Sequence, residues 1–394
     1  MKVQNTIYDI IVIGSGPSGA LAAYELAKRG FSVLLLEKRK LPRYKACGGG
    51  VTNKTVELLD FSIDSVVREM IDTITITLNY NDSYTQKFDY PVVYMVMRSE
   101  FDYFLAKKAE ERGAELIDYT RVVRVELNND FVDVYTDKTK YTAKFVIGAG
   151  GVYGAVQKSI GILKEREYAM AIASEAYPHT HCRKLDEFHN TLFIDFTDEI
   201  PSGYGWIFPK KDHISPGVYI VDLESVKKAA NLKTIAKKYF INKDIYDSFE
   251  HNYRGYLIPR GGKVNNLHYG RALLVGDEGG LCDPLTGEGI YYGMKSALIA
   301  ADVIEGCIRR NEANLSKYTH RVNKEITPDL KYARLFAILL YQHPSDFVWT
   351  FALKNIEKSY KYFARLIAGE VSYKELCFKM LGKFFKRGLK FLIP

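Results

Sequence analysis

The sequence predicts an α/β fold with three parts: a discontinuous domain around a parallel sheet, a second domain built on an antiparallel sheet, and a helical C-terminal region. A strand, a glycine turn, a helix and another strand occupy residues 9–37, and a similar strand, turn and helix follow from Arg271. Between them, residues 166–265 alternate apolar and aromatic side chains with polar ones, which is typical of a half-buried sheet. With 394 residues, 47% of them apolar, the chain is long enough for two or three domains.

The first glycine turn has the spacing of a dinucleotide-binding site. The segment reads DIIVIGSGPSGALAAYELAKRGFSVLLLEK, in which Gly14 allows a tight turn, Gly16 lets the backbone approach a pyrophosphate and Gly19 lets the helix pack on the strand. The phosphates then lie at a helix N-terminus, where free N–H groups favour negative charge. Glu37 ends the second strand, where a carboxylate can accept hydrogen bonds from an adenosine ribose. The first domain is therefore predicted to be Rossmann-like.

The later elements alternate between the two sheets. A basic, glycine-rich loop covers residues 42–55, and a helix is expected at 99–112. The predicted strands are 73–78, 86–96, 122–127, 132–135, 144–147, 168–176, 191–196, 205–208 and 217–221. We assign residues 1–67, 93–165 and 266–310 to the nucleotide domain, 68–92 and 166–265 to a substrate-binding sheet domain, and 311–394 to the helical region.

A second strand and turn distinguish between nucleotide cofactors. Asp277 ends the strand of LLVGDEGG, where its carboxylate can bond a ribityl or ribose hydroxyl, although capping a helix is a common use of such an Asp. Gly287 and Gly289 then open a helix whose free N–H groups can face the N1 and C2 carbonyl edge of an isoalloxazine ring. An NAD site needs only the first turn, so the two turns together favour FAD.

The net charge and the cysteine content limit which binding partners and metals we expect. A net charge of +8 suggests an anionic partner, and a nucleotide cofactor or an anionic membrane surface satisfies this as well as nucleic acid does. The five cysteines are scattered, and His179 and His181 lack further ligands at metal spacing. We expect reduced thiols, a cytoplasmic location, no metal and no nucleic-acid partner.

The hydrophobic pattern near the two ends of the chain indicates how the protein could contact a membrane. The first hydrophobic stretch is already the nucleotide strand, and the longest apolar runs fall far short of the roughly 20 residues of a membrane span. The last predicted helix, 376–391, has Lys and Arg on one arc and Phe and Leu on the other. Such a helix either rests on the inner face of an anionic membrane or packs on its own protein with the lysines in water.

Several motifs together resemble the FAD-dependent geranylgeranyl reductase family, within the fold group of the aromatic hydroxylases. They are the turn from Gly14 to Glu37, PRYKACGG from Pro42 to Gly49, Arg98 with Phe101 and Asp102, YGWIFP from Tyr204 to Pro209, and Gly276 and Asp277 through Pro284, Gly287, Gly289 and Ile290. PRYKACGG and YGWIFP are the most specific, and the tail AGEVSYKEL is also similar. The resemblance covers the chain from end to end.

The resemblance implies sites for FAD and for substrate. It places the loop from Arg43 to Gly50 along the flavin. Together with the glycine turns, the expected cofactor contacts are Gly14, Gly16, Ser18, Gly19, Glu37, Lys38, Arg43, Cys47, Gly48, Gly50, Arg98, Val123, Gly276, Asp277, Gly287, Gly289 and Ile290. The expected substrate wall is Tyr204, Trp206, Phe208 and Pro209.

One stretch departs from the hydroxylases. Residues 150–158 read GGVYGAVQK, whereas the hydroxylases have Asp-Gly with a downstream Ser and Arg that help bind FAD and NADPH. Direct use of NADPH is therefore in doubt. Reducing equivalents are expected from an external donor, either NAD(P)H or a separate protein such as ferredoxin.

In these reductases a flavin hydride is added to one carbon of an isolated prenyl double bond, and a proton completes the other carbon. Tyr204, Trp206 and Phe208 share one strand face, which forms either a prenyl wall or ordinary core. Cys47 lies between Lys45 and a glycine run, where a lowered pKa would suit a proton donor. The alternative for Cys47 is a small residue packed against the flavin.

The resemblance implies reduction of geranylgeranyl chains, and our first choice of substrate is archaeal-type ether lipids such as digeranylgeranylglycerol phospholipids. Free geranylgeranyl diphosphate, a chlorophyll precursor and a prenylquinone tail are further candidates. Two other functions stay open: an FAD-dependent monooxygenase of the aromatic-hydroxylase type, and a non-catalytic, flavin-dependent prenyl-lipid carrier.

Overall fold

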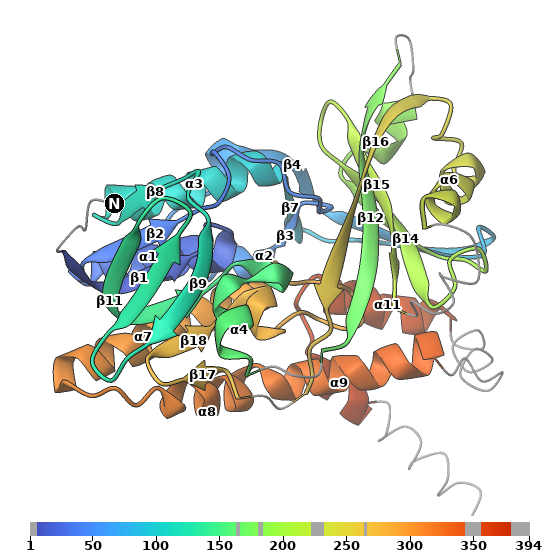
Figure 1. Ribbon diagram of the computed structural model, residues 1–394. Helices are drawn as coiled ribbons and strands as arrows, with labels where there is room; N and C mark the ends of the chain where they lie inside the picture. Colours follow the sequence, from blue (N-terminus) through green and yellow to red (C-terminus); the bar gives the residue numbers. More distant parts are fainter. Residues whose placement is uncertain are drawn as a thin grey trace, which may run out of the picture.

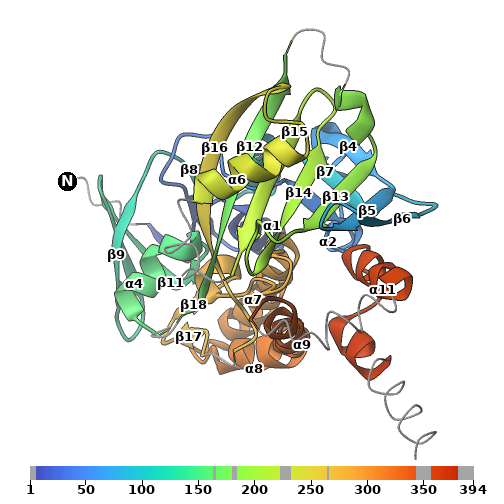
Figure 2. The same cartoon turned by 90° about the vertical axis from the view of Figure 1, so that its right-hand side faces the viewer.

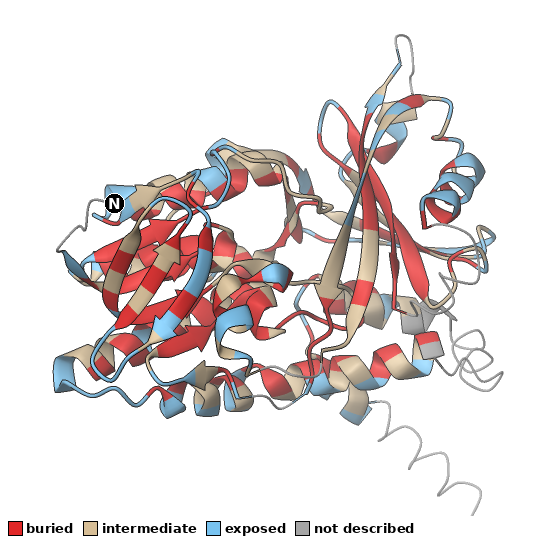
Figure 3. Cartoon of the chain, viewed as in Figure 1, coloured by how far each residue is buried: buried red, intermediate tan, exposed pale blue. Residues whose placement is uncertain are grey.

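The computed structural model describes residues 6–162, 166–179, 184–221, 232–263, 266–342 and 356–379. Two large sheets stand side by side, with a small third sheet between them and the C-terminal helices below (Figure 1). Buried residues concentrate in the strands of both large sheets and in the helices that pack on them (Figure 3). The predicted α/β class, with two sheets and a helical C-terminal region, is confirmed.

The first sheet has the order β17-β18-β11-β1-β2-β8, in which β17 is antiparallel to β18, and the hairpin of β9 and β10 pairs onto β11. Its strands are β1 (Ile7–Ile13), β2 (Val33–Leu36), β8 (Glu115–Ile117), β9 (Val122–Leu127), β10 (Val132–Thr136), β11 (Lys140–Gly148), β17 (His268–Tyr269) and β18 (Ala272–Leu274). The strands β18, β11, β1, β2 and β8 run parallel to one another. The first domain is thus completed by a strand from late in the chain, as the sequence predicts.

Local sequence explains the centre of this sheet. β1 and β2 are nearly continuous apolar runs, which is the pattern of parallel strands covered on both faces. α1 (Pro17–Lys28) begins with a proline, which suits the first helical turn, and it ends just before Gly30. α1 packs against α3 (Arg98–Glu111) and α7 (Ile290–Arg310), which come from distant parts of the chain.

The second sheet has the order β16-β12-β15-β14-β13-β5-β6. Its strands are β5 (Thr73–Leu78), β6 (Asp82–Lys87), β12 (Tyr168–Pro178), β13 (Thr191–Phe196), β14 (Gly203–Pro209), β15 (Ile214–Ile220) and β16 (Phe249–Pro259). All neighbours are antiparallel except β13 and β5, which are parallel. α6 (Leu232–Asn242), which the sequence analysis does not predict, contacts β12 and β15. α11 (Ile356–Ile367) lies below β5 and β6 (Figure 2).

The predicted strand 86–96 is wrong, because the structure has two strands there in different sheets. β6 ends at Lys87, and β7 (Val93–Val96) joins β3 (Gly50–Thr52) and β4 (Val67–Ile71) in the small sheet. Pro91 lies in the interruption and has no N–H to donate to a strand partner. In the small sheet, β4 pairs with β7. β4 spans the predicted domain boundary at residues 67 and 68, and β7 begins at the next predicted boundary, at residue 93.

The remaining elements are short or belong to the C-terminal region. They are α2 (Asn53–Val56), α4 (Ala155–Ile160), α8 (Ser316–Glu325), α9 (Thr327–Ala337), the 3-10 turns η1 (Asp64–Val66), η2 (Gly151–Tyr153), η3 (Lys184–Phe188) and η4 (Gly276–Gly279), and the π-helical turn η5 (Ile338–Gln342). The predicted basic helix 376–391 is described only as far as Lys379, so the rest of its charged arc lies outside the described residues. Within those residues, no helix is both long and apolar enough to cross a membrane.

Candidate functional site

A cavity of about 1050 Å³ lies between the two large sheets. One part lies over the ends of β1 and β2, the glycine turn and the start of α7, and the other lies against the second sheet and α11. The predicted site residues that line it are Gly14, Gly16, Ser18, Glu37, Lys38, Arg43, Cys47, Gly48, Gly50, Arg98, Val123, Tyr204, Trp206, Phe208, Asp277, Gly287, Gly289 and Ile290. The structure therefore brings both predicted sites into one continuous space. We call the part against β13, β14 and α11 the apolar arm.

Three predicted contacts lie outside the lining and serve packing instead. A Cβ on Gly19 would lie 1.9 Å from the Gly14 carbonyl oxygen, and one on Gly276 would lie 2.5 Å from Ser18 Oγ. Both glycines therefore let α1 approach the neighbouring turns. Pro209 is buried at the end of β14, where it pairs with Ile214, so it is not part of the wall that we predicted.

The first glycine turn has the shape that a pyrophosphate requires. Gly14 has φ 110°, and a Cβ there would lie 2.4 Å from the Ala149 carbonyl oxygen, so only glycine fits. A Cβ on Gly16 would have Arg43 Nη2 as its nearest neighbour, at 3.9 Å, so this backbone face is open to the cavity. With the N-terminus of α1 beside it, the turn fits the phosphates of FAD.

A buried charge network lies beside this turn. Arg43 bridges two carboxylates, with Nε 3.1 Å from Glu37 Oε2 and Nη1 3.0 Å from Asp102 Oδ2. Arg98 pairs with the same Asp102 through two bonds of 2.8 and 2.9 Å. Burial opposes ionisation of Glu37, but Arg43, the Arg39 N–H and Ser15 hold its pKa below the usual range. Glu37 is therefore an ionised acceptor at the edge of the cavity.

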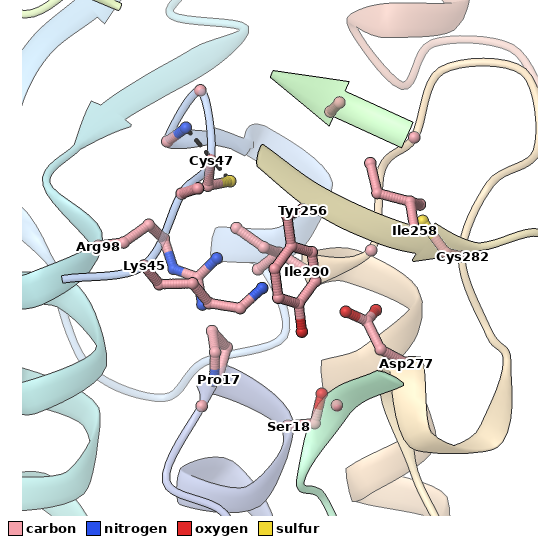
Figure 4. Close-up of a pocket in the computed structure, with 18 of the residues that line it drawn as sticks. Pro17, Ser18, Lys45, Cys47, Arg98, Tyr256, Ile258, Asp277, Cys282 and Ile290 are labelled. Carbon is pink, nitrogen blue, oxygen red and sulfur yellow. Dashed lines mark hydrogen bonds between the residues drawn. The ribbon is translucent and has the colours of Figure 1, made fainter. Parts of the chain in front are cut away.

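Cys47 lines the cavity, and Figure 4 shows it on the same side as Arg98 and Lys45. The Gly49 N–H donates to Cys47 Sγ at 3.4 Å. Burial alone would raise the pKa of the thiol, but the charges of Arg98 and Lys45 lower it below its ordinary value. Lys45 Nζ also lies 3.9 Å from the centre of the Tyr256 ring. The thiol is thus more acidic than an ordinary cysteine, as its flanking residues predict.

Asp277 and the loop that follows it form the opposite wall. Figure 4 shows the carboxylate of Asp277 and the hydroxyl of Tyr256 pointing into the same space. Gly289 caps α7, and a Cβ there would lie 3.0 Å from Asp277 Oδ1. Gly287 has φ 74°, a conformation that favours glycine. The start of α7 therefore faces the cavity with free backbone N–H groups, and the residues present fit a flavin ring.

The aromatic wall begins directly at the Cys47 loop. Neighbouring rings lie 6.1 Å apart for Tyr204 and Trp206 and 5.9 Å apart for Trp206 and Phe208. A Cβ on Gly48 would lie 2.6 Å from Phe208 Cδ2, so the wall and the loop are in close contact. Leu192 and Ile194 of β13 and Phe363, Leu366 and Ile367 of α11 also line the apolar arm.

A buried polar cluster, which the sequence pattern does not predict, lies behind the Cys47 loop. Lys210 Nζ lies 3.1 and 3.0 Å from the two carboxylate oxygens of Glu175, and His213 Nε2 lies 3.0 Å from Glu175 Oε2. Lys210 directly follows YGWIFP, which is the one sequence signal that points to it. Glu175 lies at an inward position of β12 and has no such signal.

The departing stretch 150–158 is organised by Glu278, which the sequence analysis also missed. The backbone N–H groups of Gly150 and Gln157 donate to its carboxylate at 2.6 and 2.8 Å. A Cβ on Gly154 would lie 1.9 Å from the carboxyl carbon of Glu278, so glycine is required there. Burial raises the pKa of Glu278 to about 7. Among the residues that the structure describes, no group of three or more His, Cys, Asp and Glu side chains could hold a metal ion.

Comparison with known proteins identifies an FAD-binding domain and related reductases. The FAD binding domain family matches residues 7–205. An uncharacterized protein of Methanosarcina barkeri is 32% identical over 334 residues, which are 85% of this chain and 84% of that protein. A digeranylgeranylglycerophospholipid reductase of Methanocaldococcus jannaschii is 29% identical over 353 residues, which are 85% of this chain and 88% of that protein.

The fold has a similar counterpart among solved structures. A geranylgeranyl bacteriochlorophyll reductase-like protein of Thermoplasma acidophilum superposes with a TM-score of 0.74 at 20% identity, covering 88% of this chain and 99% of that chain. The family match covers the glycine turn, the Cys47 loop and most of the second sheet up to Gly205. The chain therefore belongs to the FAD binding domain family, and it is an FAD-dependent oxidoreductase whose relatives include geranylgeranyl reductases.

Proposed function

We propose that this protein hydrogenates isolated double bonds of geranylgeranyl chains, and that the chains belong to archaeal-type ether lipids such as digeranylgeranylglycerol phospholipids. The observation that carries the proposal is the continuity of the cavity. The space that fits FAD opens, at Cys47 and Gly48, directly into an arm lined by aromatic and aliphatic side chains. A long apolar chain can therefore pass the place where the flavin ring is expected.

The apolar arm suits a substrate that has no polar groups near the reacting bond. An isolated alkene offers no charge and no hydrogen bond, so the protein must select it by shape and position. Trp206 and Phe208 supply flat apolar faces, and the α11 side chains Phe363, Leu366 and Ile367 bound the far end. Each methylene buried contributes about 0.8 kcal/mol, so several isoprene units supply on the order of 10 kcal/mol before ordering costs.

The chemistry needs a hydride and a proton at the two carbons of the double bond. FAD, when bound and reduced, supplies the hydride. We assign the proton to Cys47, because Arg98 and Lys45 lower the pKa of its thiol and stabilise the thiolate that remains after transfer. Burial raises the pKa of the neighbouring Tyr44 to about 12, so this hydroxyl keeps its proton at neutral pH.

The donor of reducing equivalents and contact with a membrane complete the proposal. We assign the donor to NAD(P)H or to a separate electron-transfer protein such as ferredoxin. A net charge of +8 suits a peripheral contact with anionic lipid on the inner face of the membrane, from which the substrate would enter.

The test uses purified protein with FAD confirmed by its absorption spectrum. The flavin is reduced with dithionite without oxygen, digeranylgeranylglycerol phospholipid is added, and product masses are read. Gain of two hydrogens per double bond supports the proposal. Free geranylgeranyl diphosphate, tested in parallel, distinguishes an ether-lipid enzyme from one that acts on the free diphosphate.

Two other outcomes would replace the proposal. Unchanged prenyl chains together with a product one oxygen heavier, formed in air from another substrate, would indicate a monooxygenase. Tight lipid binding without turnover under any reductant would indicate a carrier. Cys47→Ser and Cys47→Ala variants then test the assigned proton donor, since both keep a small residue beside the flavin and only serine keeps a weak acid.

A further inference from the structure

The loop 283–289, which leads into α7, is held by tyrosine hydroxyls from other parts of the fold. Three successive carbonyl oxygens of the loop each accept one such hydrogen bond. The pairs are Tyr219 to Pro284 at 3.1 Å, Tyr341 to Leu285 at 3.0 Å and Tyr204 to Thr286 at 2.5 Å. The second sheet and the C-terminal region therefore jointly set the position of this loop.

Among these pairs, Tyr204 and Thr286 both line the cavity, whereas Tyr341 and Leu285 lie outside the lining. The Thr286 carbonyl belongs to the same planar peptide as the Gly287 N–H. The Tyr204 hydroxyl thus fixes the plane of the peptide that precedes Gly287 and Gly289. A rotation of that plane would move the cavity-facing start of α7.

The surroundings of this peptide leave it little freedom. The Gly287 N–H donates to the Asp283 carbonyl at 2.9 Å, and a Cβ on Gly287 would lie 3.1 Å from Tyr219 Cε2. The Tyr219 ring lies 5.4 Å from the Tyr204 ring. Tyr204 is itself buried, with 9% of its surface exposed. A displacement of the Tyr204 ring would therefore pass to the loop through both the hydroxyl and the neighbouring ring.

The Tyr204 side chain is also part of the apolar wall. The same ring therefore contacts both the apolar arm and the loop 283–289. Its phenol is rigid, because the ring and the hydroxyl move as one unit about two side-chain torsions. The ring therefore lies between the apolar arm and the hydroxyl bond to Thr286.

We propose that Tyr204 couples occupancy of the apolar arm to the geometry of the flavin loop 283–289, so that a bound prenyl chain changes the environment of the flavin before any hydride moves. Tyr204 is a positioning residue in this proposal. The proposal rests on the proposed function, because it takes a prenyl chain as the occupant of the apolar arm.

The test compares Tyr204→Phe with Tyr341→Phe, which loses the same kind of bond to the neighbouring carbonyl but lies outside the cavity lining. The probe is phytanyl monophosphate, a fully saturated chain that cannot be reduced. Binding is measured by calorimetry, and the flavin is followed by the difference in absorption of oxidised FAD with and without the probe. FAD content and thermal unfolding are measured first for each variant.

We expect the unaltered protein and Tyr341→Phe to show the same flavin difference spectrum at saturation. Tyr204→Phe should bind the probe within about threefold of the unaltered protein, because the apolar ring is kept. Its difference spectrum should lose at least about half of its amplitude, because the bond to the loop is gone.

Equal amplitudes in all three proteins would overturn the coupling through Tyr204. Equal losses in both variants would also overturn it, since that result indicates general loosening of the loop. If the unaltered protein binds no prenyl chain by calorimetry, the proposed function fails first. Binding without any flavin perturbation in the unaltered protein removes this inference alone.

A second measurement keeps the proposal testable if Tyr204→Phe does not fold. Hydrogen exchange of the unaltered protein, with and without phytanyl monophosphate, reports on the backbone amides of residues 285–290 directly. The proposal requires their exchange to change when the probe binds. Unchanged exchange in that segment, with altered exchange on β14, would overturn it.

Discussion

The ammonium group of Lys210 lies 3.0 Å from Oε2 of Glu175, and its side chain packs against Gly49 of the Cys47 loop. Both members of the pair are buried, with 1% of Lys210 and 7% of Glu175 exposed. The pair therefore joins the second sheet to the loop that carries Cys47. A buried ion pair of this kind depends on both partners, because Lys210 without Glu175 loses the carboxylate that balances its buried charge.

Removal of one partner should be costly. Glu175→Gln leaves the Lys210 charge buried without a counterion, and we expect a loss of about 3 kcal/mol or more in the free energy of unfolding, measured with urea. Glu175→Leu combined with Lys210→Met should recover at least half of that loss. The control is Glu111→Gln, an exposed carboxylate whose partner Lys108 lies 2.8 Å away, with an expected change below about 1 kcal/mol. Equal effects at the two sites would contradict the role of burial.

Two glycines with similar backbone conformations should respond differently to alanine. Gly49 has φ 80°, and a Cβ there would lie 2.2 Å from the Val96 carbonyl oxygen. Gly30 has φ 86°, but nothing in the described part of the structure lies within 4 Å of its Cβ position. Gly30→Ala should cost only the backbone strain of about 1–2 kcal/mol. Gly49→Ala should cost clearly more and should weaken FAD binding, measured by thermal unfolding and FAD titration.

The acidity of Cys47 can be measured without turnover. In FAD-free protein, the rate of alkylation by iodoacetamide at Cys47, read by mass spectrometry, should reach half its maximum below the pH of about 8.5 that is typical of a free thiol. Lys45→Met should move that midpoint to higher pH, because it removes one of the positive charges that stabilise the thiolate. A midpoint at or above that of a cysteine peptide in the same buffer would contradict the assignment.

Glu278 should give the stability of the protein a specific pH dependence. Burial raises its pKa to about 7 in the folded state, from 4.5. Between these pH values the folded protein holds more protons than the unfolded chain, so stability falls as pH rises through this window. The contribution is on the order of 3 kcal/mol.

Glu278→Gln should remove that part of the pH dependence. The difference in free energy of unfolding between pH 5 and pH 7.5 should shrink relative to the unaltered protein, whatever the variant costs at a single pH. Asp283, whose pKa burial raises to about 6, is unchanged in both proteins, so the comparison isolates Glu278. An unaltered pH dependence would show that Glu278 keeps an ordinary pKa.

The sequence predicts those parts of the fold that depend on local pattern. The predicted bounds of β9 and β13 coincide with the observed strands, since continuous or alternating apolar residues report burial directly. The single strand predicted for 86–96 is wrong, because the apolar residues on the two sides of Pro91 belong to two separate strands. The two predicted glycine turns both line the cavity. They could be found from the sequence because the backbone conformation at Gly14 and Gly287 depends on the local residue type.

The parts of the site that could not be predicted depend on residues brought together by the fold. Glu175 lies on β12 and Lys210 directly follows β14, and Glu278, which follows β18, meets Gly150, which follows the neighbouring strand β11. Such pairs produce no hydrophobic periodicity or sequence motif, so a single sequence does not reveal them. The same holds for the Tyr204 hydroxyl, whose partner Thr286 follows it by many residues.

The placement of β18 beside β11 has a consequence for how the protein is made. β1 pairs with β11, and β11 pairs with β18, so the parallel sheet lacks its last parallel strand until Ala272–Leu274 leaves the ribosome. At about 5–20 residues per second, the N-terminal strands wait on the order of ten seconds or longer for that partner. Asp277 and the loop to Gly289 emerge only after it. FAD, as a ligand that stabilises the folded state by mass action, can therefore stabilise the complete cavity only after the chain has been made as far as Gly289.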